Sequence, residues 1–235
     1  MSRLLIKAAM RSADVGRLAE EIARLEAGGI DALHFDVMDG RFVPELCMGP
    51  SFIRGLRKHT PLPFEVHLLV HEPETCWAPY VEAGADCVLI HVETSADPSA
   101  TLGRIRAQGR QAGLAIAPAT PAHAVLPHLA QCDLVNVMTV APGRAGTLED
   151  GGVRNLTELA EAVRRNGPAV VVQADGAVSA QTRQRMLEAG AASLVAGYPI
   201  FSSADYGHAI GALRDGRMPQ AGGSTGRLTN TVHIR

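Results

Sequence analysis

Residues 14–37 read DVGRLAEEIARLEAGGIDALHFDV, a helix pattern followed at once by a strand pattern. Apolar side chains recur at helical spacing, at Leu18, Ile22 and Leu25. Asp14 is the candidate N-cap of this helix, and the pair Gly28-Gly29 ends it. The short apolar run at 32–37 is typical of a buried strand. The stretch therefore predicts a helix that leads directly into a strand.

The same alternation of a short apolar run with a longer helical pattern occurs about eight times along the chain. The strand candidates lie at 3–10, 32–37, 64–70, 86–92, 113–118, 133–140, 169–174 and 193–197. Further helices are expected to begin near Ser51, Pro73, Pro98, Pro121, Gly152, Ser179 and Ser203. Strands that alternate with helices form parallel sheets through right-handed crossovers. Eight such units in 235 residues favour a single (β/α)8 TIM barrel over an open doubly wound sheet.

Two segments interrupt this rhythm. The loop APGRAGTLEDGG, which follows the sixth strand at 141–152, is long and rich in glycine, and we expect it to be functional. The segment 216–235 has Gly, Ser, Thr and Pro with little apolar periodicity. We therefore expect one catalytic domain over 1–215 and a flexible C-terminal tail over 216–235.

Composition excludes several classes of protein. Lys plus Arg is 22 and Asp plus Glu is 24, a net charge of −2, and the charges are scattered, so we expect no nucleic-acid partner. The chain has no apolar run of the roughly 18 residues that a membrane span needs, so we expect no membrane partner. The four cysteines include no CxxC pair, and the N-terminal apolar run is too short for a secretory signal. These features favour the cytoplasm.

Histidines and acidic residues gather at the ends of the predicted strands. His34 and Asp36 share one face of their strand because alternate side chains point the same way, and Phe35 occupies the opposite face. We expect Phe35 to face the helices, so that His34 and Asp36 point into the barrel near its C-terminal mouth, where barrel enzymes place their sites.

Other predicted strands bring similar groups to the same mouth. Glu65 and His67 share a face, Asp175 ends the seventh strand, and His91 aligns with Glu93 on the fourth. Two histidines and two aspartates from separate strands offer the nitrogen and oxygen ligands that suit Zn²⁺, with Mn²⁺, Fe²⁺ or Co²⁺ as alternatives. The alternative is that the histidines are core residues hydrogen-bonded to their neighbours. Burying four unpaired ionisable groups is costly, which favours one divalent metal ion.

Several sequence blocks resemble the motifs of a known family. HFDVMDGRFVPELCMGP resembles the motif of the ribulose-phosphate 3-epimerase family, and further blocks in the same order resemble it as well. These blocks are EVHLLVHEPE, ADCVLIHVE, GLAIAPATP, VNVMTVAPGRAG, ADGAVSAQT and EAGAASLVAGYPIF. Together they cover about residues 4 to 215.

The resemblance implies an isomerase with a TIM barrel of the ribulose-phosphate-binding type and one divalent metal ion, inverting C3 of a ketose phosphate. By match to the motifs, the metal ligands would be His34, Asp36, His67 and Asp175. Asp36 and Asp175 would also be the catalytic acid and base, since inversion through an enediolate needs a proton-transfer group on each face of the substrate. His67 would in addition contact the substrate. Met38 and Met138 would line the pocket, although a plain core role is equally compatible with the sequence.

The family's phosphate-binding turns also have counterparts here. Phosphate is bound by backbone N–H groups in glycine-rich turns, and barrel phosphate sites commonly follow the last strands. The matching residues are Gly143, Arg144, Ala145, Gly146, Gly176, Ala177, Gly197 and Tyr198. Any one of these glycines could instead be an ordinary turn residue.

The chain departs from the family's motifs around the substrate. Ala9 replaces the usual serine of PSILSAD, Arg41 and Glu45 replace histidine and asparagine of DGHFVPN, and Arg144 replaces the aromatic residue of NPGFGGQ. Ala177 replaces a glycine, and Tyr198 and Pro199 stand in the segment that usually reads GSAIF. Pro199 has no N–H to donate to phosphate.

These departures leave the substrate open. The default is conversion of D-ribulose 5-phosphate to D-xylulose 5-phosphate, and the alternatives are allulose 6-phosphate or a tetrulose phosphate. A decarboxylase is less favoured because HFDVMD contains no lysine. A non-catalytic phosphosugar-binding protein is suggested by alanines at Ala9, Ala117, Ala141 and Ala177. Retention of all four presumed ligands favours the enzyme, and the resemblance also implies a homo-oligomer.

Overall fold

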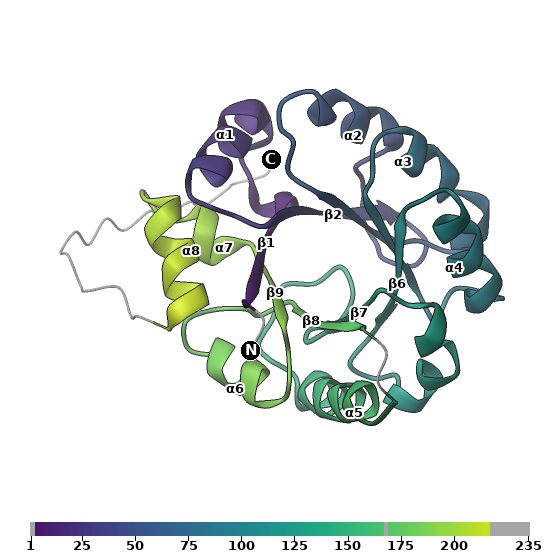
Figure 1. Cartoon of the computed structure of the whole chain (residues 1–235). Helices are drawn as coiled ribbons and strands as arrows, with labels where there is room; N and C mark the ends of the chain where they lie inside the picture. Colours follow the sequence, from purple (N-terminus) through teal and green to yellow (C-terminus); the bar gives the residue numbers. More distant parts are fainter. Residues whose placement is uncertain (1–2, 167–168, 217–235) are drawn as a thin grey trace, which may run out of the picture.

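The computed structural model describes residues 3–166 and 169–216. Eight parallel strands form a ring, and helices surround it (Figure 1). The strands of the ring are β1 Leu5–Ala9, β2 Ala32–Asp39, β4 Phe64–Leu69, β5 Cys87–His91, β6 Gln111–Ile116, β7 Leu134–Met138, β8 Val171–Asp175 and β9 Ser193–Ala196. All eight predicted strands are therefore present, with ends shifted by a residue or two.

The hydrogen-bonded order of the strands closes the ring. The order is β1-β9-β8-β7-β6-β5-β4-β2, and β1 also pairs with β2, which leaves no open edge in the ring. The short strand β3, Leu46–Cys47, pairs antiparallel with the end of β2. The sequence did not predict β3 because two residues carry no readable alternation. The structure confirms the TIM barrel.

The helices follow the strands as expected, with local differences. They are α1 Leu18–Ala27, α2 Pro50–Arg57, α3 Ala78–Glu82, α4 Pro98–Ala107, α5 Asp150–Asn166, α6 Arg183–Glu188, α7 Tyr198–Phe201 and α8 Tyr206–Asp215. Shorter 3₁₀ segments lie at Met10–Ser12, Val15–Arg17, Pro73–Thr75, Ala122–Ala124 and Leu126–Gln131. In the described part of the chain, no helix is long and apolar enough to cross a membrane.

Three helix predictions need correction. The helix expected near Pro73 starts as the 3₁₀ turn Pro73–Thr75, and α3 begins only at Ala78. Asp14 caps the 3₁₀ turn Val15–Arg17, where its side chain accepts the N–H of Gly16, and α1 begins only at Leu18. The α-helix expected near Pro121 is replaced by 3₁₀ segments. Pro127 lies within the second of them, where it offers no N–H and its ring obstructs the preceding turn.

The core lies between the strands and the helices. Phe35 and Val37 are buried there, as predicted from the alternation on β2, and the ring of Phe35 packs on Phe64 of β4 with centroids 4.8 Å apart. A second layer, inside the barrel, is polar. It consists of Lys7, Glu65, Asn136, Gln173 and Ser193, all buried. The outer layer holds the barrel together, and the inner one supports the site above it.

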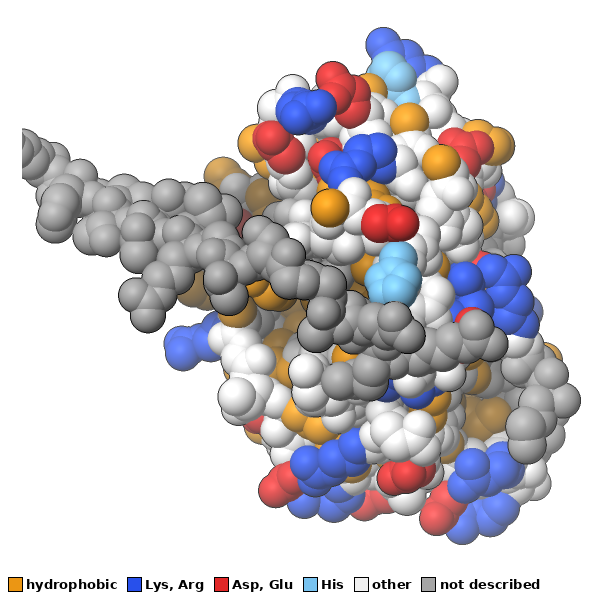
Figure 2. Space-filling model, turned by 90° about the vertical axis from the view of Figure 1, so that its left-hand side faces the viewer, with side chains coloured by type: hydrophobic (Ala, Val, Ile, Leu, Met, Phe, Trp, Pro, Cys, Tyr) orange, Lys and Arg blue, Asp and Glu red, His pale blue; other side chains and the backbone are white. Residues whose placement is uncertain are grey.

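The surface matches the balanced composition. On the face shown in Figure 2, basic side chains lie beside acidic ones at the upper and lower ends. The predicted domain boundary falls where α8 ends at Asp215 and Gly216 turns with φ 74°. The boundary itself stays a prediction, and residues 217–235 of the expected tail lie outside the described residues.

Candidate active site

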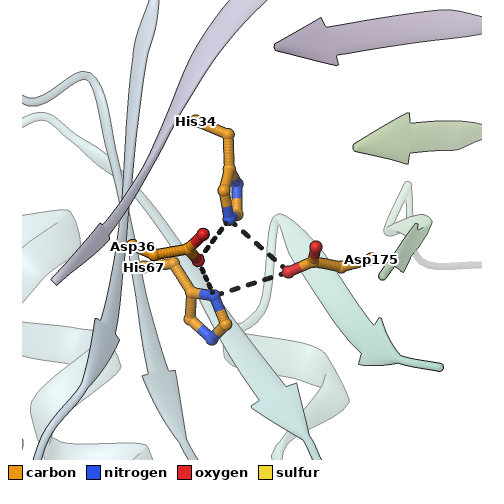
Figure 3. A group of neighbouring side chains, drawn as sticks. All are labelled: His34, Asp36, His67 and Asp175. Carbon is orange, nitrogen blue, oxygen red and sulfur yellow. Dashed lines mark hydrogen bonds and ion pairs between the residues drawn. The ribbon is translucent and has the colours of Figure 1, made fainter. Parts of the chain in front are cut away.

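Four side chains meet at the C-terminal mouth of the barrel (Figure 3). His34 and Asp36 come from β2, His67 comes from β4, and Asp175 ends β8. One ligand atom from each lies within 4.8 Å of the others. The register of β2 on β4 sets Asp36 beside His67. The structure thus brings together the four residues that the sequence singled out.

The spacing of these atoms suits a metal ion. Asp36 Oδ1 lies 3.1 Å from both His34 Nε2 and His67 Nδ1, and Asp175 Oδ2 lies 3.5 Å from the same two nitrogens. Bonds of about 2.0–2.2 Å to a tetrahedral ion place neighbouring ligand atoms roughly 3.3–3.6 Å apart. The four groups therefore fit a first-row divalent cation with little rearrangement.

Glu65, which contacts Nδ1 of His34, determines which ring nitrogen of His34 carries the proton. His34 Nδ1 is 2.8 Å from Glu65 Oε1, and the carboxylate of Glu65 also contacts the ammonium group of Lys7. Burial alone raises the pKa of Glu65, but Lys7 and His34 hold it well below its usual range. An ionised carboxylate only accepts hydrogen bonds, so Nδ1 carries the proton of the neutral ring. Nε2 then faces the two aspartates, where it would offer its lone pair to a bound cation.

A similar arrangement holds His67. Its Nε2 lies 3.0 Å from Nε2 of His91, and Nδ1 of His91 lies 2.8 Å from Glu93 Oε2. Burial raises the pKa of Glu93, but the hydrogen bond from His91 lowers it to about 2. His91 therefore donates through Nδ1 to Glu93 and accepts at Nε2, so that His67 donates from Nε2. Nδ1 of His67 is left facing the cluster, available to a cation.

The charges of the cluster favour a cation. Burial lowers the pKa of His34, but the carboxylates of Asp36 and Asp175 raise it well above its usual range. Burial raises the pKa of Asp36, but His34 holds it far below its usual range. Two ring nitrogens and two carboxylates converge on one point, where positive charge, carried by protons or by a metal ion, is stabilised. The residues present therefore fit a divalent metal ion, whose identity the geometry leaves open.

The polar layer below the cluster fixes Asp175 from beneath. Asn136 Nδ2 donates to Asp175 Oδ2 at 2.9 Å, and Gln173 Nε2 donates to both Asn136 Oδ1 and Glu65 Oε1. Ser193 Oγ completes the layer by donating to Gln173 Oε1. Sequence reasoning did not assign Asn136, Gln173 or Ser193. The available signal was their place on the inward face of apolar strands.

Above the cluster lies a cavity of about 240 Å³. Asp36 and Asp175 line it with side chains 14% and 10% exposed, and Met38 and Met138 form part of its wall. His67 is fully buried and does not line this cavity. The predicted contact between His67 and the substrate stays a prediction.

The predicted phosphate turns line the same cavity from three loops. They contribute Gly143, Arg144, Ala145, Gly146, Gly176, Ala177, Gly197 and Tyr198. Gly176 has φ 96°, and a Cβ there would lie 2.5 Å from Cγ2 of Val140. Ala177 has φ 48°, a conformation that favours glycine. The turn thus keeps a glycine-like backbone although its second residue is alanine.

The departures from the family motifs divide into two groups. Ala9, Arg144 and Tyr198 line the cavity, whereas Arg41 does not: its side chain is 63% exposed and lies 4.0 Å from Glu72. Glu45 forms an ion pair with Arg11 at 2.6 Å.

Three further residues lie near the mouth of the barrel. Arg11 and Ser12 also line the cavity, and sequence reasoning missed both because only their position after β1 could have indicated them. Asp39 has a structural role, since its carboxylate accepts the N–H groups of Arg41, Phe42 and His71.

Comparison with known proteins gives close relatives and more distant structural neighbours. Residues 5–201 match the model of the ribulose-phosphate 3 epimerase family. A ribulose-5-phosphate-3-epimerase, chloroplastic, from Arabidopsis thaliana is 34% identical over 94% of this chain and 79% of its own length. The ribulose-phosphate 3-epimerase of Bacillus subtilis is 36% identical over 86% of this chain and 94% of its own.

Solved structures support the fold alone. A 3-hexulose-6-phosphate synthase superposes with a TM-score of 0.62 at 20% identity, covering 91% of this chain and 99% of its own. A thiamine phosphate pyrophosphorylase from Pyrococcus furiosus gives a TM-score of 0.59 at 14% identity, covering 91% and 94%. Since the family model spans most of the barrel, the chain belongs to the ribulose-phosphate 3-epimerase family, which confirms the expected carbohydrate epimerase of the isomerase class.

Proposed function

We propose that the protein is a metal-dependent 3-epimerase that interconverts D-ribulose 5-phosphate and D-xylulose 5-phosphate. The observation that carries this proposal is the cluster of His34, Asp36, His67 and Asp175 on the floor of a cavity whose rim consists of glycine-rich turns. The cluster suits proton transfer beside a cation, and the turns suit a phosphate group. Relatives named for this reaction support the choice of substrate.

The two aspartates are the proposed acid and base. Asp36 Oδ1 and Asp175 Oδ2 face the histidines, and within the described residues Asp36 Oδ2 and Asp175 Oδ1 accept no hydrogen bond. Each carboxylate therefore has one oxygen available to a substrate in the cavity. Asp36 removes the C3 proton on one face, and Asp175 returns a proton on the other, with the roles exchanged in the reverse direction.

The metal ion is proposed to be Zn²⁺, with Mn²⁺, Fe²⁺ or Co²⁺ as alternatives. His34 and His67 would hold it through Nε2 and Nδ1, together with Asp36 and Asp175. When bound, such an ion supplies Lewis-acid stabilisation of the negative charge that develops on the substrate oxygens.

The phosphate group is proposed to bind the turns at Gly143–Gly146, Gly176–Ala177 and Gly197–Tyr198. Free backbone N–H groups in such turns suit an anion, although the Arg144 N–H itself is donated to the carbonyl of Ala141, and the Arg144 guanidinium can add a bidentate contact. Pro199 contributes no N–H. Met38 and Met138 exclude water around the reacting carbon. The rim could also accept another chain length, so allulose 6-phosphate and a tetrulose phosphate are the alternative substrates.

A decarboxylase is disfavoured because no lysine lines the cavity among the described residues. A non-catalytic sugar-phosphate-binding protein has little need for four clustered ligand groups, two of them carboxylates that reach the cavity. Measuring the metal content of the purified protein distinguishes these two alternatives from the epimerase.

The experiment combines turnover with metal content. Purified protein is assayed for inversion of pentulose, hexulose and tetrulose phosphates, and its metal is measured by mass spectrometry. We expect one divalent ion per chain and inversion of ribulose 5-phosphate, both lost in Asp36→Ala and His67→Ala. His71→Ala, outside the cluster and half exposed, is the matched control and should retain both. Metal-free protein that binds sugar phosphates without inverting them would refute the proposal.

A cytoplasmic homo-oligomer is proposed for the cell. The free cysteines Cys47, Cys76, Cys87 and Cys132 suit a reducing compartment. One relative from Oryza sativa is named a cytoplasmic isoform, and the Arabidopsis relative is chloroplastic. Cell fractionation tests the location, and light scattering after size-exclusion chromatography tests the assembly; a monomer at micromolar concentration would contradict it.

A further inference from the structure

A chain of three side chains leads away from the cluster behind His67. The imidazoles of His67 and His91 stack with centroids 5.0 Å apart and an interplanar angle of 18°, and their Nε2 atoms are 3.0 Å apart. His91 is fully buried, with the ring of Phe42 4.8 Å from its own. Glu93 Oε2 is 2.8 Å from His91 Nδ1. None of these groups other than His67 has a place in the proposed chemistry.

The far end of this chain is fixed by the backbone. The second oxygen of Glu93, Oε1, accepts the N–H of Ala117 at 2.7 Å, in the loop after β6. Both carboxylate oxygens of Glu93 therefore face donors, one on each side. A carboxylate fits such a position because each of its oxygens accepts and neither needs to donate.

Followed from Glu93 towards the cluster, the hydrogen bonds allow a single arrangement of protons on the two histidines. Glu93 accepts from Nδ1–H of His91, so His91 has a lone pair on Nε2 and accepts from Nε2–H of His67. Nδ1 of His67, the atom that faces Asp36 and Asp175, then carries a proton in the metal-free protein and would offer its lone pair to a bound cation. Two lone pairs or two N–H groups at the contact between the histidines would repel each other, so the tautomer of one ring dictates that of the next.

We propose that Glu93 is a positioning residue, which acts through His91 to hold His67 in the tautomer that presents Nδ1 as a metal ligand. The inference rests on the proposed metal site. It concerns residues that touch neither the substrate nor the ion, and it assigns a role to His91 and Glu93 that the four-residue cluster alone does not require.

The proposal predicts that Glu93→Gln weakens metal binding more than Glu93→Ala. A packing role for Glu93 predicts the opposite order. In Glu93→Gln the carbonyl oxygen must accept the Ala117 N–H, because the reverse orientation sets two N–H donors against each other. The amide NH₂ then faces His91 Nδ1 and selects the opposite tautomer, which forces a proton onto Nδ1 of His67. An amide in place of a carboxylate behind a histidine is known to select the wrong tautomer in this manner. Glu93→Ala instead leaves His91 free to adopt either tautomer.

The test measures Zn²⁺ affinity of the full-length protein by competition with a chromophoric chelator. Loss of a partner behind a ligating histidine typically weakens metal binding by about 10–100-fold. We expect Glu93→Gln to bind Zn²⁺ at the weak end of that range and Glu93→Ala less weakly. Glu74→Gln is the matched control, since Glu74 is a partly buried carboxylate that accepts from the 95–97 loop and contacts no imidazole. It should bind Zn²⁺ like the parent protein.

A second readout needs no metal and no activity. Long-range ¹H–¹⁵N correlation spectra of the chelator-treated protein report which ring nitrogen of each histidine carries the proton. In the parent protein we expect a proton on Nδ1 of His91, none on its Nε2, and a proton on Nε2 of His67. In Glu93→Gln we expect the His91 proton on Nε2 and no proton on Nε2 of His67. Unchanged tautomers, or a Glu93→Gln affinity within about threefold of the parent protein, would overturn the inference. If the parent protein binds no divalent ion, the proposed function fails instead, and the spectra still decide the tautomers.

Discussion

Replacing Ala177 with glycine should stabilise the protein. Ala177 follows Gly176 in the turn after β8 and has φ 48°, in the left-handed region. For a residue with a Cβ this conformation costs about 1–2 kcal/mol relative to the right-handed region, whereas glycine adopts it without that cost. The change therefore relieves strain without altering the direction of the backbone N–H groups.

The magnitude follows from two opposing contributions. Relief of the strain gains about 1–2 kcal/mol, and the greater freedom of glycine in the unfolded chain loses about 0.4–1 kcal/mol. Ala177 is only partly buried, so the loss of its methyl group costs little packing. We expect a net gain of about 0.5–1 kcal/mol in the free energy of unfolding, which raises Tm by roughly 2 °C in a domain of this size.

Urea denaturation and thermal melting measure this change, with Ala180→Gly as the control. Ala180 is also partly buried, but it lies outside the positive-φ residues, so its replacement should destabilise the protein by about 0.4–1 kcal/mol. The two substitutions are thus the same chemical change with opposite expected signs. A loss of stability in Ala177→Gly equal to that in Ala180→Gly would refute the assignment of a strained alanine in this turn.

Three further changes test other parts of the structure. Lys7→Met leaves the buried carboxylate of Glu65 without its cation and should lower the free energy of unfolding by about 3–5 kcal/mol in urea titrations; a loss below 1 kcal/mol would contradict the buried pair. Burial raises the pKa of Asp39, but the backbone N–H groups that donate to it lower the pKa overall. Asp39 therefore stabilises the folded protein above its unfolded pKa of about 3.9. This stabilisation is lost as the pH falls through the lower folded pKa. Asp39→Ala should therefore reduce the drop in urea midpoint between pH 5 and pH 2. Arg144→Gln should raise KM for a ketose phosphate about tenfold with little change in kcat, and initial rates showing the reverse pattern would place Arg144 in the chemical step.

Sequence periodicity predicted the barrel well because each strand is buried on both sides and so forms a short apolar run. Phe35 and Val37 reach the helix layer as their alternation with His34 and Asp36 required. The four cluster residues were also predictable, because ionisable side chains stand out at the end of an apolar strand. Local elements were less predictable. Pro127 turned an expected α-helix into 3₁₀ segments.

The support of the site could not be predicted from the sequence. Asn136 and Gln173 meet because β7 and β8 pair with a particular register, which no single strand contains. The contact between His67 and His91 likewise depends on how β4 lies on β5. Arg41 was expected to border the substrate, yet the turn at Gly40, with φ 71°, carries it away from the cavity. Contacts between strands decided the first two cases, and a turn decided the third.

The source of the hydrogen at C3 tests the central claim, that two carboxylates act on opposite faces of the substrate. Ribulose 5-phosphate is converted in D₂O by metal-loaded protein, and the first xylulose 5-phosphate formed is analysed by NMR and mass spectrometry. With Asp36 as acceptor and Asp175 as donor, the product should carry deuterium at C3 from the first turnover. Product that retains the hydrogen of its own substrate would show one group serving both faces and would contradict the account.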